Sequence, residues 1–217
     1  MSEFSENNGE HFDIMTDKGE REVRVASQCF SDNIGLSIPV KYNPDSHPDE
    51  FYTPLVAFLH AISLFSYKAL SKGILMRGAI AYGEIYQTST VIVGEPFIEA
   101  VSHEKTANYP RIIVASSAKN EIQKFSQRYP YGWDLEKINE RINFKRDEID
   151  GTVFFDWLNF HRFQPEDNSV SSKQLEIDNT IISAKKIMQG RIKEETDISV
   201  LQKLFWIVRY FEKLTTP

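Results

Sequence analysis

Cysteine is almost absent from this chain of 217 residues, which contains Cys29 alone. A single cysteine cannot form an internal disulfide, so we expect a reducing, cytoplasmic setting with Cys29 as a thiol in the core. Positive charge is also scarce, because 31 Asp and Glu outnumber 25 Lys and Arg and leave a net charge of −6. This balance disfavours a polyanion-binding surface, so we expect no nucleic-acid partner.

Long apolar runs are missing as well, since none approaches the roughly 20 residues that span a bilayer. The first residues, MSEFSENNGEHFD, are polar and acidic and resemble neither a signal peptide nor a transit peptide. We therefore expect a soluble protein without a membrane partner. The length suffices for one domain with a real core and a small helical appendage.

The pattern of apolar residues predicts alternating strands and helices from residue 22 onward. The expected elements are a strand hairpin, a helix, two strands, a helix, a strand and a helix, over residues 22–30, 34–42, 49–73, 74–86, 89–94, 95–108, 111–117 and 118–129. A polar, interrupted stretch follows at 129–151, then one strand at 150–160 and two helices at 171–192 and 197–214. Residues 1–20 carry little periodic signal, so we expect them to be poorly ordered or loosely docked.

This order predicts an α+β fold, with helices on one face of a mixed sheet and further helices at the C-terminal end. We divide the chain into a polar N-terminal segment at 1–21, a main domain at 22–160 and a helical extension at 161–217.

Two charged residues, Asp32 and Arg77, lie next to apolar segments and are candidates for a functional site. Asp32 lies at the tip of the first hairpin, where it is either a turn former or a ligand for a hard divalent cation. Arg77 lies among apolar neighbours at the start of a strand, where it either forms a structural ion pair or binds phosphate or carboxylate. Glu84, further along this strand, is expected to face solvent.

The helix at 95–108 carries further polar residues without an assigned role. Glu99, His103 and Lys105 are expected on or near its surface. Arg111 is expected to pair with Glu104 and so to fix the helix to the following strand, which is a structural role.

The segments FSDNI, LMRGAIAYGEIY, VGEPFIEAVSHEKTA and YPRIIVAS occur in this order. Together they resemble the class III nucleotide cyclase homology domain, and their phrasing is most similar to the Pycsar-type pyrimidine cyclases of bacterial antiphage defence. The resemblance covers about residues 25–117 and implies a ferredoxin-like, class III cyclase sheet. It implies a lyase that converts UTP or CTP to the 3′,5′-cyclic nucleotide and pyrophosphate.

The resemblance also implies partners and roles. Asp32 matches the second of two metal-binding Asp residues, which hold Mn²⁺ or Mg²⁺ in the family. Arg77 matches the family's strand Arg, with a role left open between structure and phosphate contact. A homodimer is expected, together with a separate effector that cyclic UMP or cyclic CMP activates.

The chain departs from the family in two places. The family's first metal-binding Asp lies on an earlier strand, and Asp13 in HFDIMT matches it only superficially, because no crossover helix fits between Met15 and Glu22. Ile98 stands where a catalytic Asn is common if Gly94 and Ala100 are aligned. The alternative is therefore a catalytically silent or truncated cyclase-fold module that dimerises or binds nucleotide. An unrelated α+β binding protein is a third possibility.

Overall fold

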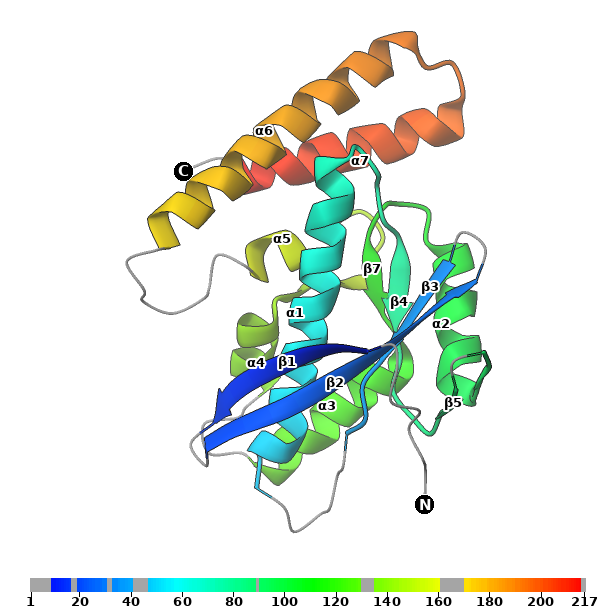
Figure 1. Ribbon diagram of the computed structural model, residues 1–217. Helices are drawn as coiled ribbons and strands as arrows, with labels where there is room; N and C mark the ends of the chain where they lie inside the picture. Colours follow the sequence, from blue (N-terminus) through cyan, green and yellow to red (C-terminus); the bar gives the residue numbers. More distant parts are fainter. Residues whose placement is uncertain are drawn as a thin grey trace.

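The computed structural model describes residues 9–16, 19–30, 33–40, 47–88, 90–129, 135–160 and 170–215. These residues form an α+β protein (Figure 1). The strands are β1 (Gly9–Thr16), β2 (Gly19–Phe30), β3 (Asn33–Ser37), β4 (Gly78–Ile80), β5 (Tyr86–Gln87), β6 (Ile92–Val93), β7 (Ile112–Val114), β8 (Phe144–Arg146) and β9 (Val153–Phe155). The helices are α1 (Asp49–Ser71), α2 (Glu95–Thr106), α3 (Ser116–Arg128), α4 (Leu135–Ile142), α5 (Trp157–Phe160), α6 (Val170–Glu194) and α7 (Ile198–Thr215).

Within the described residues the strands form three sheets and not the single mixed sheet that was expected. The orders are β1-β2-β3, β4-β7-β9-β8 and β5-β6. The four-stranded sheet is mixed, because β4 and β7 run parallel whereas β7, β9 and β8 pair antiparallel. The α+β class is thus confirmed, and a strand that would join β3 to β4 is not present in the described part of the chain.

The strand expected at 74–86 is wrong in its length, because only residues 78–80 pair with β7. Gly83 has a φ of 154°, and a Cβ at that position would stand 2.9 Å from the ring of Pro96. The chain therefore leaves the sheet where it passes close to the start of α2. The hairpin partner of residues 92–93 is the short strand β5 and not the longer strand.

Residues 9–16, which were expected to be poorly ordered or loosely docked, form a strand. β1 pairs antiparallel with β2 along its whole length, from Gly9 opposite Ala26 to Thr16 opposite Gly19. In HFDIMT, Phe12 and Ile14 stand on either side of Asp13, a short period-two pattern that is typical of a strand. This short pattern is the sequence signal for β1.

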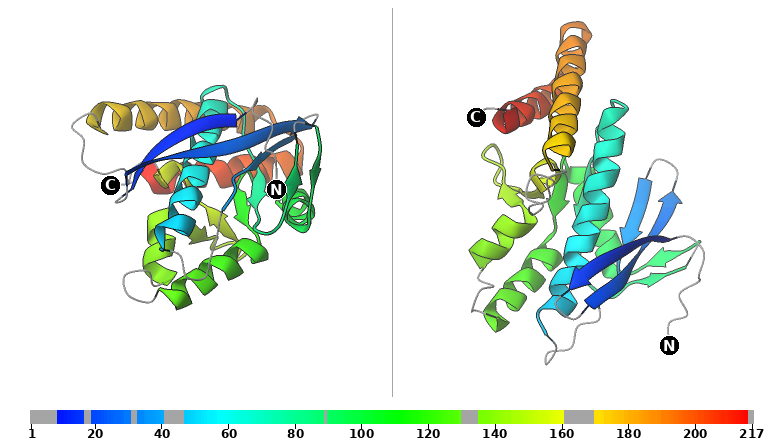
Figure 2. Two further views of the ribbon diagram at one scale, coloured as in Figure 1. Left: turned by 60° about the horizontal axis from the view of Figure 1, so that its bottom comes forward. Right: turned by 60° about the vertical axis from the view of Figure 1, so that its left-hand side comes forward.

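Helix α1 crosses the centre of the molecule and forms much of its core (Figures 1 and 2). It begins at Asp49 and ends before Gly73, whose φ of 73° suits a helix end. The ring of Phe51 stacks on Phe125 of α3 with 4.9 Å between centroids, and Leu59 is fully buried. Burial of this apolar face, at roughly 25 cal/mol per Å², is what fixes α1 against α3.

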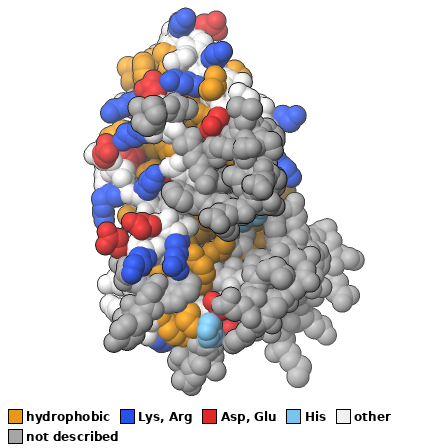
Figure 3. Space-filling model, turned by 90° about the vertical axis from the view of Figure 1, so that its left-hand side faces the viewer, with side chains coloured by type: hydrophobic (Ala, Val, Ile, Leu, Met, Phe, Trp, Pro, Cys, Tyr) orange, Lys and Arg blue, Asp and Glu red, His pale blue; other side chains and the backbone are white. Residues whose placement is uncertain are grey.

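By length and composition α1 is also the one described helix that could cross a membrane. A core helix of a soluble protein has the same properties, and α1 carries buried apolar residues from the main cluster. On the face shown in Figure 3, basic and acidic side chains are interspersed over the upper part, with no large field of one sign among the described residues. These features are compatible with a soluble protein.

The two C-terminal helices are confirmed within a few residues of the expected bounds. α6 and α7 form an antiparallel pair that lies across the end of α1 (Figure 2). Ile181 and Met188 of α6 and Phe211 of α7 are fully buried in the main core cluster. The hydroxyl of Tyr67 in α1 lies 2.9 Å from that of Thr180 in α6. The helix pair is therefore packed on the rest of the chain and not suspended from it.

Candidate functional site

The hairpin that carries Asp32 forms where the sequence predicts it. β2 pairs antiparallel with β3, and the last pair of this register joins Phe30 to Asn33. Ser31 and Asp32 connect the two strands in the sequence, and both lie outside the residues that the structure describes. Cation binding by Asp32 stays a prediction.

The β1–β2 register shows that Asp13 does not complete a site with Asp32. Asp13 lies opposite Glu22, and eight residues separate Glu22 from Phe30 at the other end of β2. A strand rises roughly 3.3 Å per residue, so about 26 Å separates these backbone positions. Carboxylates that share a cation lie in direct contact with it. Within one chain, Asp13 is therefore not the missing ligand.

Arg77 is brought to α2 by an ion pair with Glu104, with 2.5 Å between Nε and Oε1. The Arg77 side chain is 46% exposed, so this pair contributes little to stability on its own. The expected pairing of Glu104 with Arg111 is wrong, because Arg77 occupies that carboxylate. Phosphate binding by Arg77 would have to compete with Glu104 for the guanidinium.

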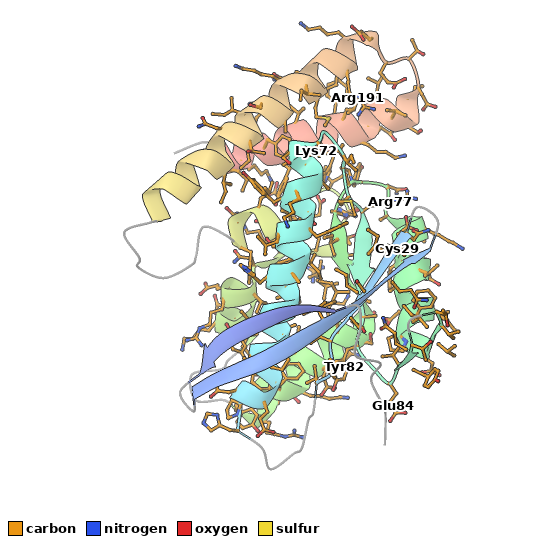
Figure 4. The ribbon with its side chains drawn as sticks, in the orientation of Figure 1. Cys29, Lys72, Arg77, Tyr82, Glu84 and Arg191 are labelled. Carbon is orange, nitrogen blue, oxygen red and sulfur yellow. The ribbon has the colours of Figure 1, made fainter. Side chains whose placement is uncertain are left out.

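At the other end of β4, Glu99 ties α2 to the start of α3. The Glu99 carboxylate accepts hydrogen bonds from the backbone N–H of Ser117, at 3.2 Å, and from its hydroxyl. The Ser117 hydroxyl in turn accepts the backbone N–H of Tyr82 at 2.9 Å. No side chain within α3 caps its first turn, so a carboxylate from α2 satisfies that end of the helix. Figure 4 shows Arg77 and Tyr82 on either side of β4, which α2 thus holds at both ends.

The remaining polar residues of this region are less engaged. Nε2 of His103 lies 3.9 Å from Glu99, one helical turn away. Lys105 lies in the last turn of α2, where a cation interacts favourably with the helix dipole. Glu84 is exposed as expected, and Ile98 is also exposed. Burial raises the pKa of Tyr82, and the nearby Glu121 raises it further, so its hydroxyl stays protonated at neutral pH.

Arg111 forms a buried polar cluster that sequence reasoning missed. Its guanidinium donates from Nη1 to Asp147 and from Nη2 to Asp150, both in the β8–β9 connection. The indole N–H of Trp206 in α7 donates to the same Asp147 oxygen at 2.8 Å, and the Tyr109 ring centroid lies 5.1 Å from the guanidinium carbon. The carboxylates lie within the stretch that was read only as polar and interrupted. DEIDG, a turn sequence between two short strands, was the available signal.

This cluster also determines the charge state of Asp150. Partial burial raises its pKa, but hydrogen bonds from Arg111 and Thr152, together with the charge of Arg111, lower it by more. The resulting pKa is about 2, compared with an ordinary value of 3.8. Asp150 is therefore an ionised structural partner at neutral pH and not a proton donor.

Asp156 is the most deeply buried carboxylate described, and its partners come from three elements. It accepts hydrogen bonds from the Asn159 amide at 2.6 Å and from the Tyr210 hydroxyl of α7. Nζ of Lys145 in β8 lies 2.5 Å from its Oδ2. This buried carboxylate thus has donors enough to offset its burial, and it links β8, α5 and α7.

Cys29 was expected in the core, and this expectation is wrong. Its thiol is exposed, whereas the neighbouring Gln28 is buried. Because side chains alternate along a strand, placing Gln28 inward puts Cys29 on the outer face of β2.

The described side chains contain no group of three His, Cys, Asp or Glu residues that could hold a metal ion. Asp147 and Asp150 in the β8–β9 connection, and Asp156 directly after β9, already have cationic partners.

Comparison with known proteins identifies no relative. No family model matches the chain, and neither the curated proteins nor the solved structures contain a significant match.

Proposed function

We propose that this chain is a pyrimidine nucleotide cyclase that converts UTP or CTP to the 3′,5′-cyclic nucleotide as an antiphage messenger for a separate effector. The observation that supports the proposal is the order β2–β3, α1, β4, β5–β6, α2 and β7. This order matches the four sequence segments on which the resemblance rests. Asp32 falls in the sequence between the paired ends of β2 and β3, and Arg77 stands directly before β4.

In this proposal Asp32 is one ligand of a divalent cation, Mn²⁺ or Mg²⁺, which would supply charge neutralisation at the triphosphate. Arg77 would bind the nucleotide phosphates after exchanging Glu104 for them, since its fork suits phosphate and carboxylate alike. No further step is assigned to the metal, since Asp32 lies outside the described residues.

A second candidate is a silent cyclase-fold module that dimerises or binds nucleotide without turnover. One observation favours it, namely that Asp13 lies about 26 Å along β2 from the hairpin that carries Asp32. Loss of a metal ligand removes most of the charge stabilisation on which phosphoryl transfer depends.

A mass-spectrometric assay separates the two candidates. The protein is incubated with each of the four nucleoside triphosphates and Mn²⁺, beside Asp32→Ala, Arg77→Ala and the matched control Ser31→Ala. Cyclic UMP or cyclic CMP is expected from wild type and Ser31→Ala, and its loss is expected in Asp32→Ala. Absence of product from wild type with every triphosphate would overturn the cyclase and leave the silent module.

A further inference from the structure

Positive charge is concentrated on the C-terminal helix pair, although the chain as a whole is acidic. Residues 179–193 of α6 contain four Lys or Arg and residues 198–211 of α7 contain two, and neither stretch contains Asp or Glu. The whole chain has a net charge of −6. α6 and α7 lie at one end of the molecule, away from α2 and α3 (Figures 1 and 2). The helix pair is therefore a local basic region on an acidic protein.

Each of the two helices presents a row of exposed residues with the same spacing. We refer to the two rows together as the helix-pair face, which consists of Ile182, Lys186, Gln189 and Lys193 in α6 and Ile198, Gln202, Phe205 and Arg209 in α7. Residues with this spacing lie within about 60° of one another around a helix axis, so each row is a continuous stripe about 16 Å long. Ile182 is 44% exposed, Phe205 is 52% exposed and Ile198 is 72% exposed.

Both rows lie on the same side of the helix pair, the side that faces away from α1. Nζ of Lys185 in α6 lies 3.3 Å from the carboxylate of Glu212 in α7, across the seam between the helices. Lys185 adjoins the α6 row, three residues after Ile182, and Glu212 adjoins the α7 row, three residues after Arg209. Thr180, whose hydroxyl contacts α1, lies about 160° around the α6 axis from Ile182. The rows therefore form one surface, two helices wide, that α1 does not cover.

The cations of this face are available to a ligand. Lys186, Lys193 and Arg209 are exposed and form no ion pair with any described residue, whereas Lys185 is paired with Glu212. Three positive charges thus face solvent without a nearby carboxylate among the described residues. Because these like charges repel one another, an anionic surface is the partner that gains most from them.

We propose that the helix-pair face docks the protein on an anionic lipid bilayer. In this arrangement Lys186, Lys193 and Arg209 bind lipid phosphates, and Phe205 and the two isoleucines insert between the headgroups. A bilayer suits the face better than a protein partner does. The apolar side chains of the face are separated by cations and glutamines, whereas protein interfaces gather their apolar contacts at the centre. Mobile lipids accommodate each side chain separately.

This contact requires no membrane-spanning segment. The expectation of no membrane partner rested only on apolar runs long enough to cross a bilayer, and a helix pair that lies in the interface needs none. With a net charge of −6, the chain as a whole is repelled by an anionic surface. Binding would therefore report on the local basic face, and it does not depend on the proposed cyclase reaction.

The test is sedimentation of the full chain, without nucleotide, with vesicles of phosphatidylglycerol and phosphatidylcholine in equal parts and with vesicles of phosphatidylcholine alone. Wild type is expected to bind only the anionic vesicles, and high salt should release it. Lys186→Gln/Arg209→Gln is expected to weaken binding about 25-fold, because each cation at the surface contributes roughly a factor of five. Phe205→Ser is expected to weaken it about 5-fold, since half of the side chain is exposed for insertion.

Lys105→Gln/Lys119→Gln is the matched control, because it removes two exposed cations from α2 and α3, away from the helix pair (Figure 1). It should bind as wild type does, and circular dichroism checks the fold of each variant. The proposal would be overturned by wild type that ignores anionic vesicles, by equal binding to both kinds of vesicle, or by a control that loses as much as the face variants. Binding to polyglutamate in place of vesicles would overturn it in favour of an acidic protein partner. Vesicle binding without cyclic nucleotide product would support the docking while overturning the proposed reaction.

Discussion

Substitution of Asp147 by Asn tests whether the buried Arg111 cluster holds the C-terminal half of the chain together. Asp147 receives the guanidinium of Arg111 and the indole N–H of Trp206 on one carboxylate oxygen. Its other oxygen accepts the backbone N–H of Ile149 at 2.9 Å. Asn has nearly the same shape, so the substitution removes the negative charge and leaves little cavity.

The expected loss follows from the burial of the pair. Removal of one partner of a buried ion pair typically costs 3–5 kcal/mol, because the remaining charge is left without compensation. Asn still accepts one neutral hydrogen bond and Asp150 still contacts Arg111, so we expect the lower end, about 3 kcal/mol. For a chain of this size that corresponds to a fall in Tm of roughly 6–12 °C.

The assay is urea and thermal unfolding followed by circular dichroism, with Glu148→Gln as the matched control. Glu148 is the next residue of the same connection, and its exposed pair with Lys213 should contribute less than about 0.5 kcal/mol. Equal stabilities for Asp147→Asn and Glu148→Gln would refute the reasoning. The double variant Arg111→Met/Asp147→Leu should lose less than the sum of its single changes, because both charges of the buried pair are removed and only the partly exposed Asp150 loses its partner.

Two further predictions follow from particular residues. Gly94→Ala is expected to destabilise the protein by about 2 kcal/mol or more, because the φ of Gly94 is positive and the new Cβ would meet the Glu84 carbonyl. Gly78→Ala is the control, since a Cβ at Gly78 would have no atom within 4 Å. Equal melting temperatures for the two variants would contradict the expectation. The lowered pKa of Asp150 stabilises the fold above its unfolded value near 3.8, and this contribution disappears as the pH falls towards 2. Asp150→Asn should therefore flatten the stability profile between about pH 4 and pH 2, and an unchanged acid profile would contradict this assignment.

The elements that sequence could predict are those with a strong local pattern. α1, α2, α3, α6 and α7 each carry apolar residues at helical spacing between recognisable ends, and all five form close to their expected bounds. The β2–β3 hairpin forms for the same kind of reason, since its turn chemistry is local. These helices and this hairpin depend on residues that are close together in the sequence.

Long-range partners could not be predicted in this way. Nothing near Arg111 in sequence indicates that its carboxylates lie 36 and 39 residues further on, and the nearby Glu104 was the wrong choice. Cys29 was placed inside because its strand is apolar, although the strand presents Gln28 to the interior. The division of strands among three sheets depends on which edges meet, and that is decided by packing and not by propensity.

The polar contacts of α7 show why the C-terminal helices belong to the physical core of the protein. Trp206 and Tyr210 lie one helical turn apart, and they donate to Asp147 and Asp156 respectively. Each carboxylate also has a cationic partner beside β7 or in β8, so α7 closes two buried anionic sites at once. Without α7 both carboxylates would lose a hydrogen-bond donor and the aromatic side chains that exclude water from them. Access of water would weaken their ion pairs, because it raises the local dielectric constant. The helical extension therefore completes the electrostatics of the β8–β9 hairpin, and through Arg111 it also fixes the strand that pairs with β4 beside Arg77.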